Sequence, residues 1–317
     1  MDYGRDLNKT LDVYTNARGL FINLDQVTEC LIDSVILLAA RAHGFVKGKH
    51  SQKTQTFVKA CIAYVHITIP TLESADKQIK YFLLSAQIAL LNGLIGETDS
   101  LCKAVLANLD ENFNPLIGEL NKTADILLTL LGFLVVVPSD PERDFFQLAN
   151  GVINILSKDW SHDQTKMLTV KIYCGLIGFL SSQTQQKLPY RIAYVNSNDQ
   201  VFIGNQEFLK EANEMLDYCF NQILDIITKL NENKSANLKN LFNICVRTAN
   251  VLVANGNFST RSISNISNKM FKMADGYLTE YNATPEGTRE PLLRDPINRT
   301  FEACRKKKEA AAKIAET

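Results

Sequence analysis

Apolar residues recur at intervals of three and four along most of this chain, and no alternation of apolar and polar residues lasts beyond a few positions. The clearest example runs from Phe208 to Leu230, where the apolar side chains are spaced to form one face of a helix. The predicted helices come in pairs that recur roughly every 40 to 47 residues, the spacing of HEAT-like repeats. Because each pair can bury its apolar face only against its neighbours, we expect an all-α fold, a HEAT-like α-solenoid of antiparallel helix pairs.

The solenoid is expected to cover residues 1–284 of the 317-residue chain. Residues 285–296 contain prolines and charges and are interpreted as a linker. Residues 297–317 favour a charged C-terminal helix or tail with a weak apolar stripe and the basic cluster from Arg305 to Lys308. We therefore expect this last segment to be partly frayed.

Composition excludes several classes of function. Lys and Arg together number 34, as do Asp and Glu, so no net field draws the chain to nucleic acid or to an anionic membrane. The longest apolar run, from Ile126 to Val137, is shorter than the roughly 20 residues that span a bilayer. The N-terminus lacks the apolar core of a signal peptide. The seven cysteines are scattered through apolar patterns, as expected of small buried residues in a reducing compartment.

A basic turn separates two predicted helices, the second of which covers residues 54–68. Gly44, Gly48 and Lys49 resemble a phosphate-binding loop, but one residue is missing between the glycines, His50 stands where Ser or Thr is required, and no strand precedes the turn. Lys47, Lys49, Lys53 and Lys59 with His50 form a basic edge. This basic edge has two interpretations. It is an ordinary solvated turn, or it is a surface that contacts an acidic partner or lipid headgroups.

The sequence contains no recognisable catalytic or cofactor-binding motif. His43, His50, His66 and His162 lack further ligands at the spacing that metal sites use, so we expect turn and core histidines and no metal. No nucleophile elbow is present, and no Cys or Ser stands in a catalytic setting. We therefore expect a protein that is not an enzyme and needs no cofactor.

The one long irregular stretch runs from Lys187 to Asn205 and includes Tyr190, Tyr194 and Phe202. Loops longer than about 15 residues within helical arrays are often functional, although a tolerated insertion remains an equal alternative. Together with the basic turn, this stretch supplies the candidate protein-binding residues, which are Lys47, Lys49, Tyr194, Asn196, Asn198 and Asp199.

Several segments carry a resemblance to a known family. The run from Arg41 to Pro70, RAHGFVKGKHSQKTQTFVKACIAYVHITIP, is followed in order by VVPSDPE from Val136, VNSND from Val195 and FLKEAN from Phe208. The chain thereby resembles the C-terminal part of the vacuolar protein sorting 35-like proteins, the large helical subunit of the endosomal retriever complex. The first run is long and specific, whereas the others count mainly by their order.

The resemblance implies a cytoplasmic, endosome-associated scaffold in retromer-independent recycling of membrane protein cargo to the plasma membrane. The implied partners are the metallophosphoesterase-fold vacuolar protein sorting 29 subunit and the coiled-coil and COMM-domain proteins of the commander complex. It implies no nucleic acid, and membrane contact only peripherally, through partners. Family members are much longer, and no counterpart of their N-terminal solenoid is present. The resemblance therefore does not support binding of the arrestin-like vacuolar protein sorting 26 subunit.

Two other interpretations stay open at this point. A retromer-like large subunit shares the solenoid, but the basic-turn run argues against it. A helical-repeat module that binds nucleic acid through its basic turns is disfavoured by the zero net charge. The chain is a C-terminal piece, a shortened paralogue or an incomplete gene model of the family that it resembles.

Overall fold

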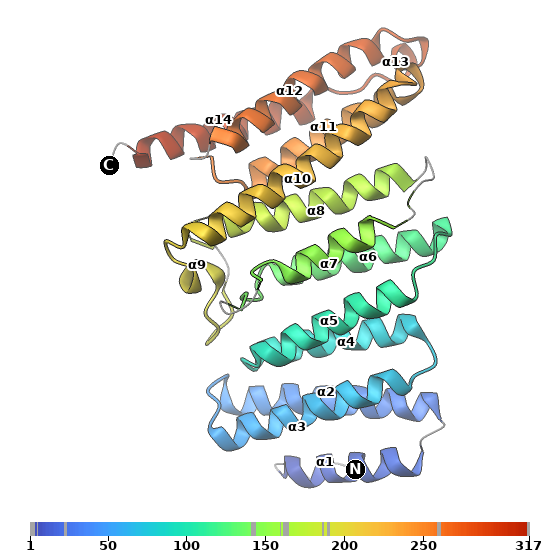
Figure 1. The fold of residues 1–317 in the computed structure, drawn as a ribbon, viewed down its shortest axis with the longest axis vertical. Coiled ribbons are helices and arrows are strands. Elements are labelled where there is room, and N and C mark those ends of the chain that lie inside the picture. The colour runs from blue at the N-terminus through green and yellow to red at the C-terminus, as the bar shows by residue number, and fades with distance from the viewer. Residues whose placement is uncertain are drawn as a thin grey trace. The chain divides into compact units, whose positions relative to one another are not determined.

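The computed structural model of the chain describes residues 4, 6–21, 24–140, 144–158, 160, 165–185, 187–188, 191–258 and 261–315. All regular secondary structure within these ranges is helical. No strand occurs within these ranges (Figure 1), so the predicted all-α fold is confirmed. The chain divides into two compact units. The first comprises residues 1–114, 136–155 and 189–201, and the second comprises residues 115–135, 156–188 and 202–317.

The first unit stacks helices in the order of the chain. Its elements are α1 (Leu7–Leu20), α2 (Asp25–Val46), α3 (Gln52–Thr68), the 3-10 turn η1 (Ile69–Thr71), α4 (Ala75–Leu91), α5 (Ile95–Glu111), α7 (Gln147–Leu156, all but its last residue) and α9 (Asn198–Val201). Helix α2 packs against α1, α3 and α4, and α4 packs against α5. Each helix therefore buries its apolar face mainly against its neighbours, as in α-solenoids.

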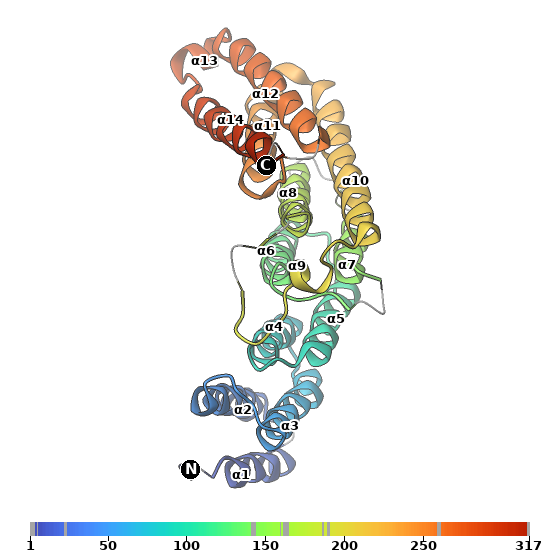
Figure 2. The same cartoon turned by 90° about the vertical axis from the view of Figure 1, so that its left-hand side faces the viewer.

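The second unit follows the same rule. Its elements are α6 (Ile117–Leu134), α8 (Lys166–Gln183), α10 (Gln206–Asn231), α11 (Lys234–Asn255), α12 (Arg261–Asn282), α13 (Pro285–Arg289) and α14 (Asp295–Ala315). Helix α8 packs against α6, α10 and α11. Helices α11, α12 and α14 contact one another and lie side by side in both views (Figures 1 and 2).

Helix α10 illustrates why these segments are helical. Its N-cap residue Asn205 accepts hydrogen bonds through Oδ1 from the backbone N–H groups of Glu207 (3.0 Å) and Phe208 (3.1 Å), which satisfies two donors that the first turn leaves free. Its buried residues are Phe208, Ala212, Leu216, Cys219, Phe220, Ile223, Ile227 and Leu230. The amphipathic helix predicted from Phe208 to Leu230 is thus confirmed.

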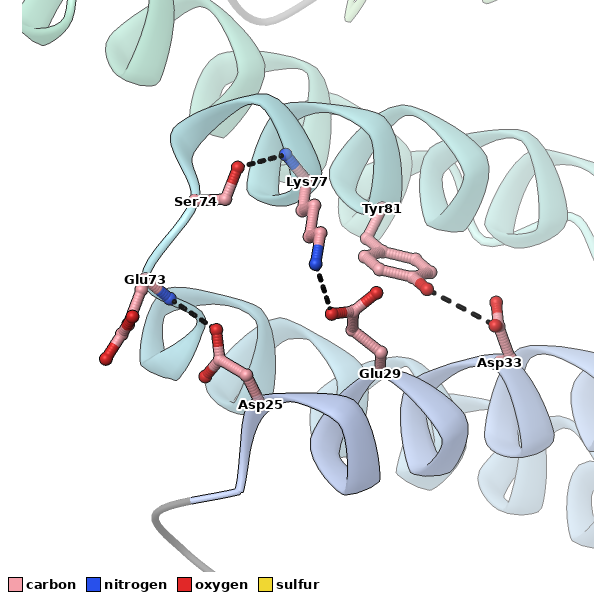
Figure 3. A network of polar contacts seen from close by, with 7 residues as sticks. All are labelled: Asp25, Glu29, Asp33, Glu73, Ser74, Lys77 and Tyr81. Carbon is pink, nitrogen blue, oxygen red and sulfur yellow. Dashed lines mark hydrogen bonds and ion pairs between the residues drawn. The ribbon is translucent and has the colours of Figure 1, made fainter.

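A ladder of polar contacts joins α2 to α4 (Figure 3). The acidic residues Asp25, Glu29 and Asp33 lie at successive turns of α2. Asp25 accepts from the backbone N–H of Glu73 (3.2 Å), Glu29 from Nζ of Lys77 (2.5 Å), and Asp33 from the hydroxyl of Tyr81 (3.2 Å). All three pairs are 48 residues apart. Glu73 lies just before α4, and the other two pairs join equivalent turns of α2 and α4, which therefore lie in register.

Polar contacts at similar separations occur elsewhere in the chain. In the second unit, Lys171 of α8 pairs with Asp125 of α6 (2.8 Å) across 46 residues. Lys234, at the start of α11, pairs with Glu280 near the end of the next helix, α12 (2.7 Å), also across 46 residues. In the first unit, the Tyr64 hydroxyl donates to the backbone oxygen of Tyr14 (3.3 Å) across 50 residues. These separations match or slightly exceed the spacing predicted from the apolar pattern.

The Asp33–Tyr81 contact makes stability depend on pH. Burial first, and then Asp33, raises the pKa of Tyr81 from 10 to about 12. Because the pKa is higher in the folded than in the unfolded protein, the contribution of Tyr81 is complete below pH 10 and is lost as the pH rises towards 12. We expect Tyr81→Phe to lower the free energy of unfolding at neutral pH by about 0.5–1.5 kcal/mol and to weaken this alkaline loss. Urea titrations at pH values spanning this window test it, and identical pH profiles for the two proteins would contradict it.

The segment after Asn282, expected to be a linker followed by a charged C-terminal helix or tail, contains the two helices α13 and α14. Pro285 opens the short helix α13, whose N-cap residue Thr284 accepts from the backbone N–H of Gly287 (3.0 Å). Helix α14 then returns to α11 and α12, where Ile297 and Cys304 are buried and Phe301 contacts Phe271 edge-on at 5.5 Å between ring centroids. The weak stripe of α14 is supplemented by polar contacts, since Lys307 donates to the carbonyl of Ala254 (2.8 Å) and Lys308 to Asn268 Oδ1 (2.8 Å).

Candidate functional site

The basic turn between α2 and α3 has a fixed backbone. Lys47 and Gly48 both adopt left-handed conformations, with φ of 51° and 76°. The N–H of Lys47 donates to the carbonyl of Gly44 (3.4 Å), and the N–H of Gly48 donates to that of His43 (3.2 Å), which satisfies carbonyls at the end of α2. Ser51 then caps α3 by accepting from the N–H of Thr54 (3.3 Å).

Tyr194 meets this turn from a distant part of the sequence. Its ring lies so close to Gly48 that a Cβ added there would be 2.9 Å from Cε2 of Tyr194 and 3.2 Å from Cε1 of His43. Tyr194 is itself left-handed, with φ of 64°, and is 64% exposed. The structure therefore brings together three of the predicted site residues, Lys47, Lys49 and Tyr194, and all three are exposed.

The other predicted site residues have different roles. Asn196 is exposed, but Asn198 is buried and accepts through Oδ1 from the N–H of Ser139 (2.7 Å). The Asp199 carboxylate is 3% exposed and pairs with Arg191 at 3.0 Å. Asn198 and Asp199 therefore hold the segment after residue 190 in place, and we do not expect them to contact a partner directly. Tyr190 lies outside the described residues.

The histidines do not form a metal site within the described ranges, where no three His, Cys, Asp or Glu side chains gather as ligands. His43 and His50 lie 6.0 Å apart between ring centroids. Burial lowers the pKa of His50, and the charge of His43 lowers it further, against an opposing effect of Asn92. His66 packs edge-on against Phe82, and His162 is outside the described residues.

The cysteines are buried as predicted, except for Cys30, which is exposed. Burial raises the pKa of the Cys61, Cys102, Cys219 and Cys245 thiols to about 12. These four groups are therefore protonated at neutral pH and are poor nucleophiles.

Sequence reasoning missed Phe45, which lies beside the basic turn and is 59% exposed. Its spacing continues the apolar stripe of α2, whose buried members include Leu31, Val35, Leu38 and Ala42. The sequence therefore carried no signal that Phe45 would be exposed, because its position is one at which a buried side chain is expected.

The contact between Gly48 and Tyr194 predicts the effect of a single methyl group. Gly48→Ala places a side chain on a residue with φ of 76° and against the Tyr194 ring. We therefore expect the free energy of unfolding to fall by about 1–2 kcal/mol. We also expect the amide hydrogens of residues 191–197 to exchange faster, because the Tyr194 ring is displaced. Gly44→Ala is the matched control because nothing lies within 4 Å of a Cβ there, and in a helix it stabilises by up to about 1 kcal/mol. Equal exchange at residues 191–197 in both variants would contradict the contact.

These features define a class of protein: an all-α, helical-repeat protein whose candidate site is an exposed surface for binding. No helix among the described residues is long and apolar enough to cross a membrane.

Comparison with known proteins then places the chain in a family. Residues 1–282 match the model of the VPS35L C-terminal domain, so the chain belongs to that family and the predicted resemblance is confirmed. The chain is 31% identical over 280 residues to the VPS35 endosomal protein sorting factor-like protein of Dictyostelium discoideum, covering 86% of this chain and 28% of that protein.

Two further relatives agree. The human VPS35 endosomal protein-sorting factor-like protein is 29% identical over 280 residues, covering 86% of this chain and 29% of the relative. The zebrafish (Danio rerio) protein is 32% identical over 236 residues, covering 73% of this chain and 24% of the relative. The chain thus spans less than a third of the length of these relatives, within a family of endosomal protein-sorting factors.

Proposed function

We propose that this chain is a scaffold subunit of the retriever complex, acts in endosome-to-plasma-membrane recycling of membrane cargo, and binds the vacuolar protein sorting 29 subunit without catalysing a reaction. The observation that carries the proposal is the family match across residues 1–282. A helical-repeat architecture supports it, since stacked helix pairs offer extended surfaces on which other proteins assemble.

The proposal includes association with the coiled-coil and COMM-domain proteins of the commander complex in the cytoplasm at endosomes. It does not extend to the arrestin-like vacuolar protein sorting 26 subunit, because the family match concerns the C-terminal domain alone.

A pull-down at two salt concentrations tests the proposal against nucleic-acid binding. Immobilised chain is expected to retain the vacuolar protein sorting 29 subunit of the same organism at both low and high salt. A nucleic-acid binder would instead retain an RNA or DNA oligonucleotide and lose it steeply as salt rises, because that affinity depends on released counterions. Retention of the oligonucleotide but not of the subunit would overturn the proposal.

A further inference from the structure

A groove opens beside the basic turn, between the start of α1, the end of α2 and the start of α3. Its volume is about 520 Å³. Its apolar wall includes Leu7, Phe45, Val46 and Phe57, and Lys53 and Thr54 also line it. Phe45 is 59% exposed, so a large apolar surface faces solvent at a concave site. Such a site can receive one large apolar side chain from another molecule.

The surroundings of the groove are basic although the chain as a whole is neutral. Lys53 lines the groove, and Lys47 and Lys49 follow at the adjoining turn. All three are exposed, and none forms an ion pair with a residue that the structure describes. The acidic residue of the groove, Asp6, is engaged, since its carboxylate accepts from the N–H of Lys9 (3.1 Å) and caps α1. Carboxylates of a partner would therefore find unpaired ammonium groups here.

Two segments that are far apart in the sequence each place a residue with an uncommon backbone conformation at this surface. Lys47 and Tyr194, neither of them glycine, are left-handed at the point where the Tyr194 ring meets Gly48. Left-handed residues other than glycine cost free energy and persist where the surrounding structure fixes them, often at binding sites. Tyr194 thereby presents a second exposed aromatic ring at the turn.

We infer that this surface binds a short acidic segment of a partner protein, which inserts one large apolar side chain beside Phe45 and places carboxylates against Lys47, Lys49 and Lys53. The concave apolar groove favours such a segment over a bilayer, because one side chain fills a pocket whereas a headgroup layer does not. The inference goes beyond the proposed scaffold function, since it does not require binding of the vacuolar protein sorting 29 subunit.

Selection from a random-peptide display library on the purified full chain tests the inference without choosing a ligand in advance. The enriched peptides are expected to carry several acidic residues around one large apolar residue. Synthetic copies of them are expected to bind at least tenfold more weakly to Phe45→Ala and to the Lys47→Glu/Lys49→Glu double variant. The matched control, Lys269→Glu/Lys272→Glu on α12, exchanges two other exposed lysines and should bind as the original chain does.

Circular dichroism of each variant confirms that it is folded before binding is compared. A pull-down with the Lys47→Glu/Lys49→Glu variant distinguishes failure of this inference from failure of the proposed function. The variant is expected to retain the vacuolar protein sorting 29 subunit even though it no longer binds the peptides. The inference is overturned if no acidic peptides are enriched, or if they bind the variants and the control equally. It is also overturned if phosphatidylserine vesicles bind the chain through the same lysines while the peptides do not.

Discussion

Leu38→Ala lowers the free energy of unfolding by about 2–5 kcal/mol, whereas Leu37→Ala changes it by no more than about 0.5 kcal/mol. The two leucines are adjacent in α2, but Leu38 is 2% exposed and Leu37 is 54% exposed. Truncation of Leu38 removes apolar contacts and leaves a cavity among the stacked helices, whereas truncation of Leu37 shortens a side chain that already meets water.

Urea unfolding followed by circular dichroism measures both effects. The chain contains two compact units, so urea can unfold it in more than one transition. The two variants are compared at the transition whose midpoint Leu38→Ala shifts. The pair is well matched in chemistry and helix position, so a similar cost for both leucines would mean that α2 does not face its neighbours as described.

Gly287→Ala is expected to release the C-terminal segment from the second unit. A Cβ at Gly287 would lie 2.0 Å from the backbone oxygen of Tyr281, and no rotation of a side chain relieves a clash with backbone. We expect a cost of about 1–3 kcal/mol, since forced overpacking is relieved only by displacement of α13. Helix α14, which follows α13, would then lose its fixed approach to α11 and α12.

Limited proteolysis measures this release. The variant is expected to be cleaved after Asn282 much faster than the original chain. Gly276→Ala in α12 is the control, because nothing lies within 4 Å of a Cβ there and alanine favours the helix. Cleavage of the two variants at the same rate would show that α13 does not depend on this close approach.

Local patterns predicted most of the long helices well, because most of them carry a clear apolar stripe of their own. The range from Phe208 to Leu230 was found from spacing alone, and α10 extends it by two residues before Phe208 and one after Leu230. Helix α13 was not predicted, because Pro285 and Gly287 are typical of linkers. The close approach of Gly287 to the backbone of Tyr281, six residues earlier, is a feature of the backbone path that composition does not indicate.

The candidate site was predicted in its parts but not in its arrangement. Lys47 and Tyr194 were each identified from local composition, yet their meeting at Gly48 depends on the fold and leaves no local signal. Asn198 and Asp199 were predicted as protein-binding residues because they lie in the long irregular stretch from Lys187 to Asn205. Their side chains are instead buried and paired, Asn198 with Ser139 and Asp199 with Arg191. Ser139 is 59 residues from Asn198, and nothing in the local pattern around Asn198 indicates that partner.

The most direct test of the proposed scaffold role measures molar mass. This chain is mixed with the vacuolar protein sorting 29 subunit of the same organism, and the molar mass of each species in the mixture is determined. Size-exclusion chromatography with light scattering is expected to give one species that contains one copy of each protein and persists at moderate salt. Two separate species, from a chain shown to be helical and folded, would contradict the proposal that this chain is a retriever scaffold.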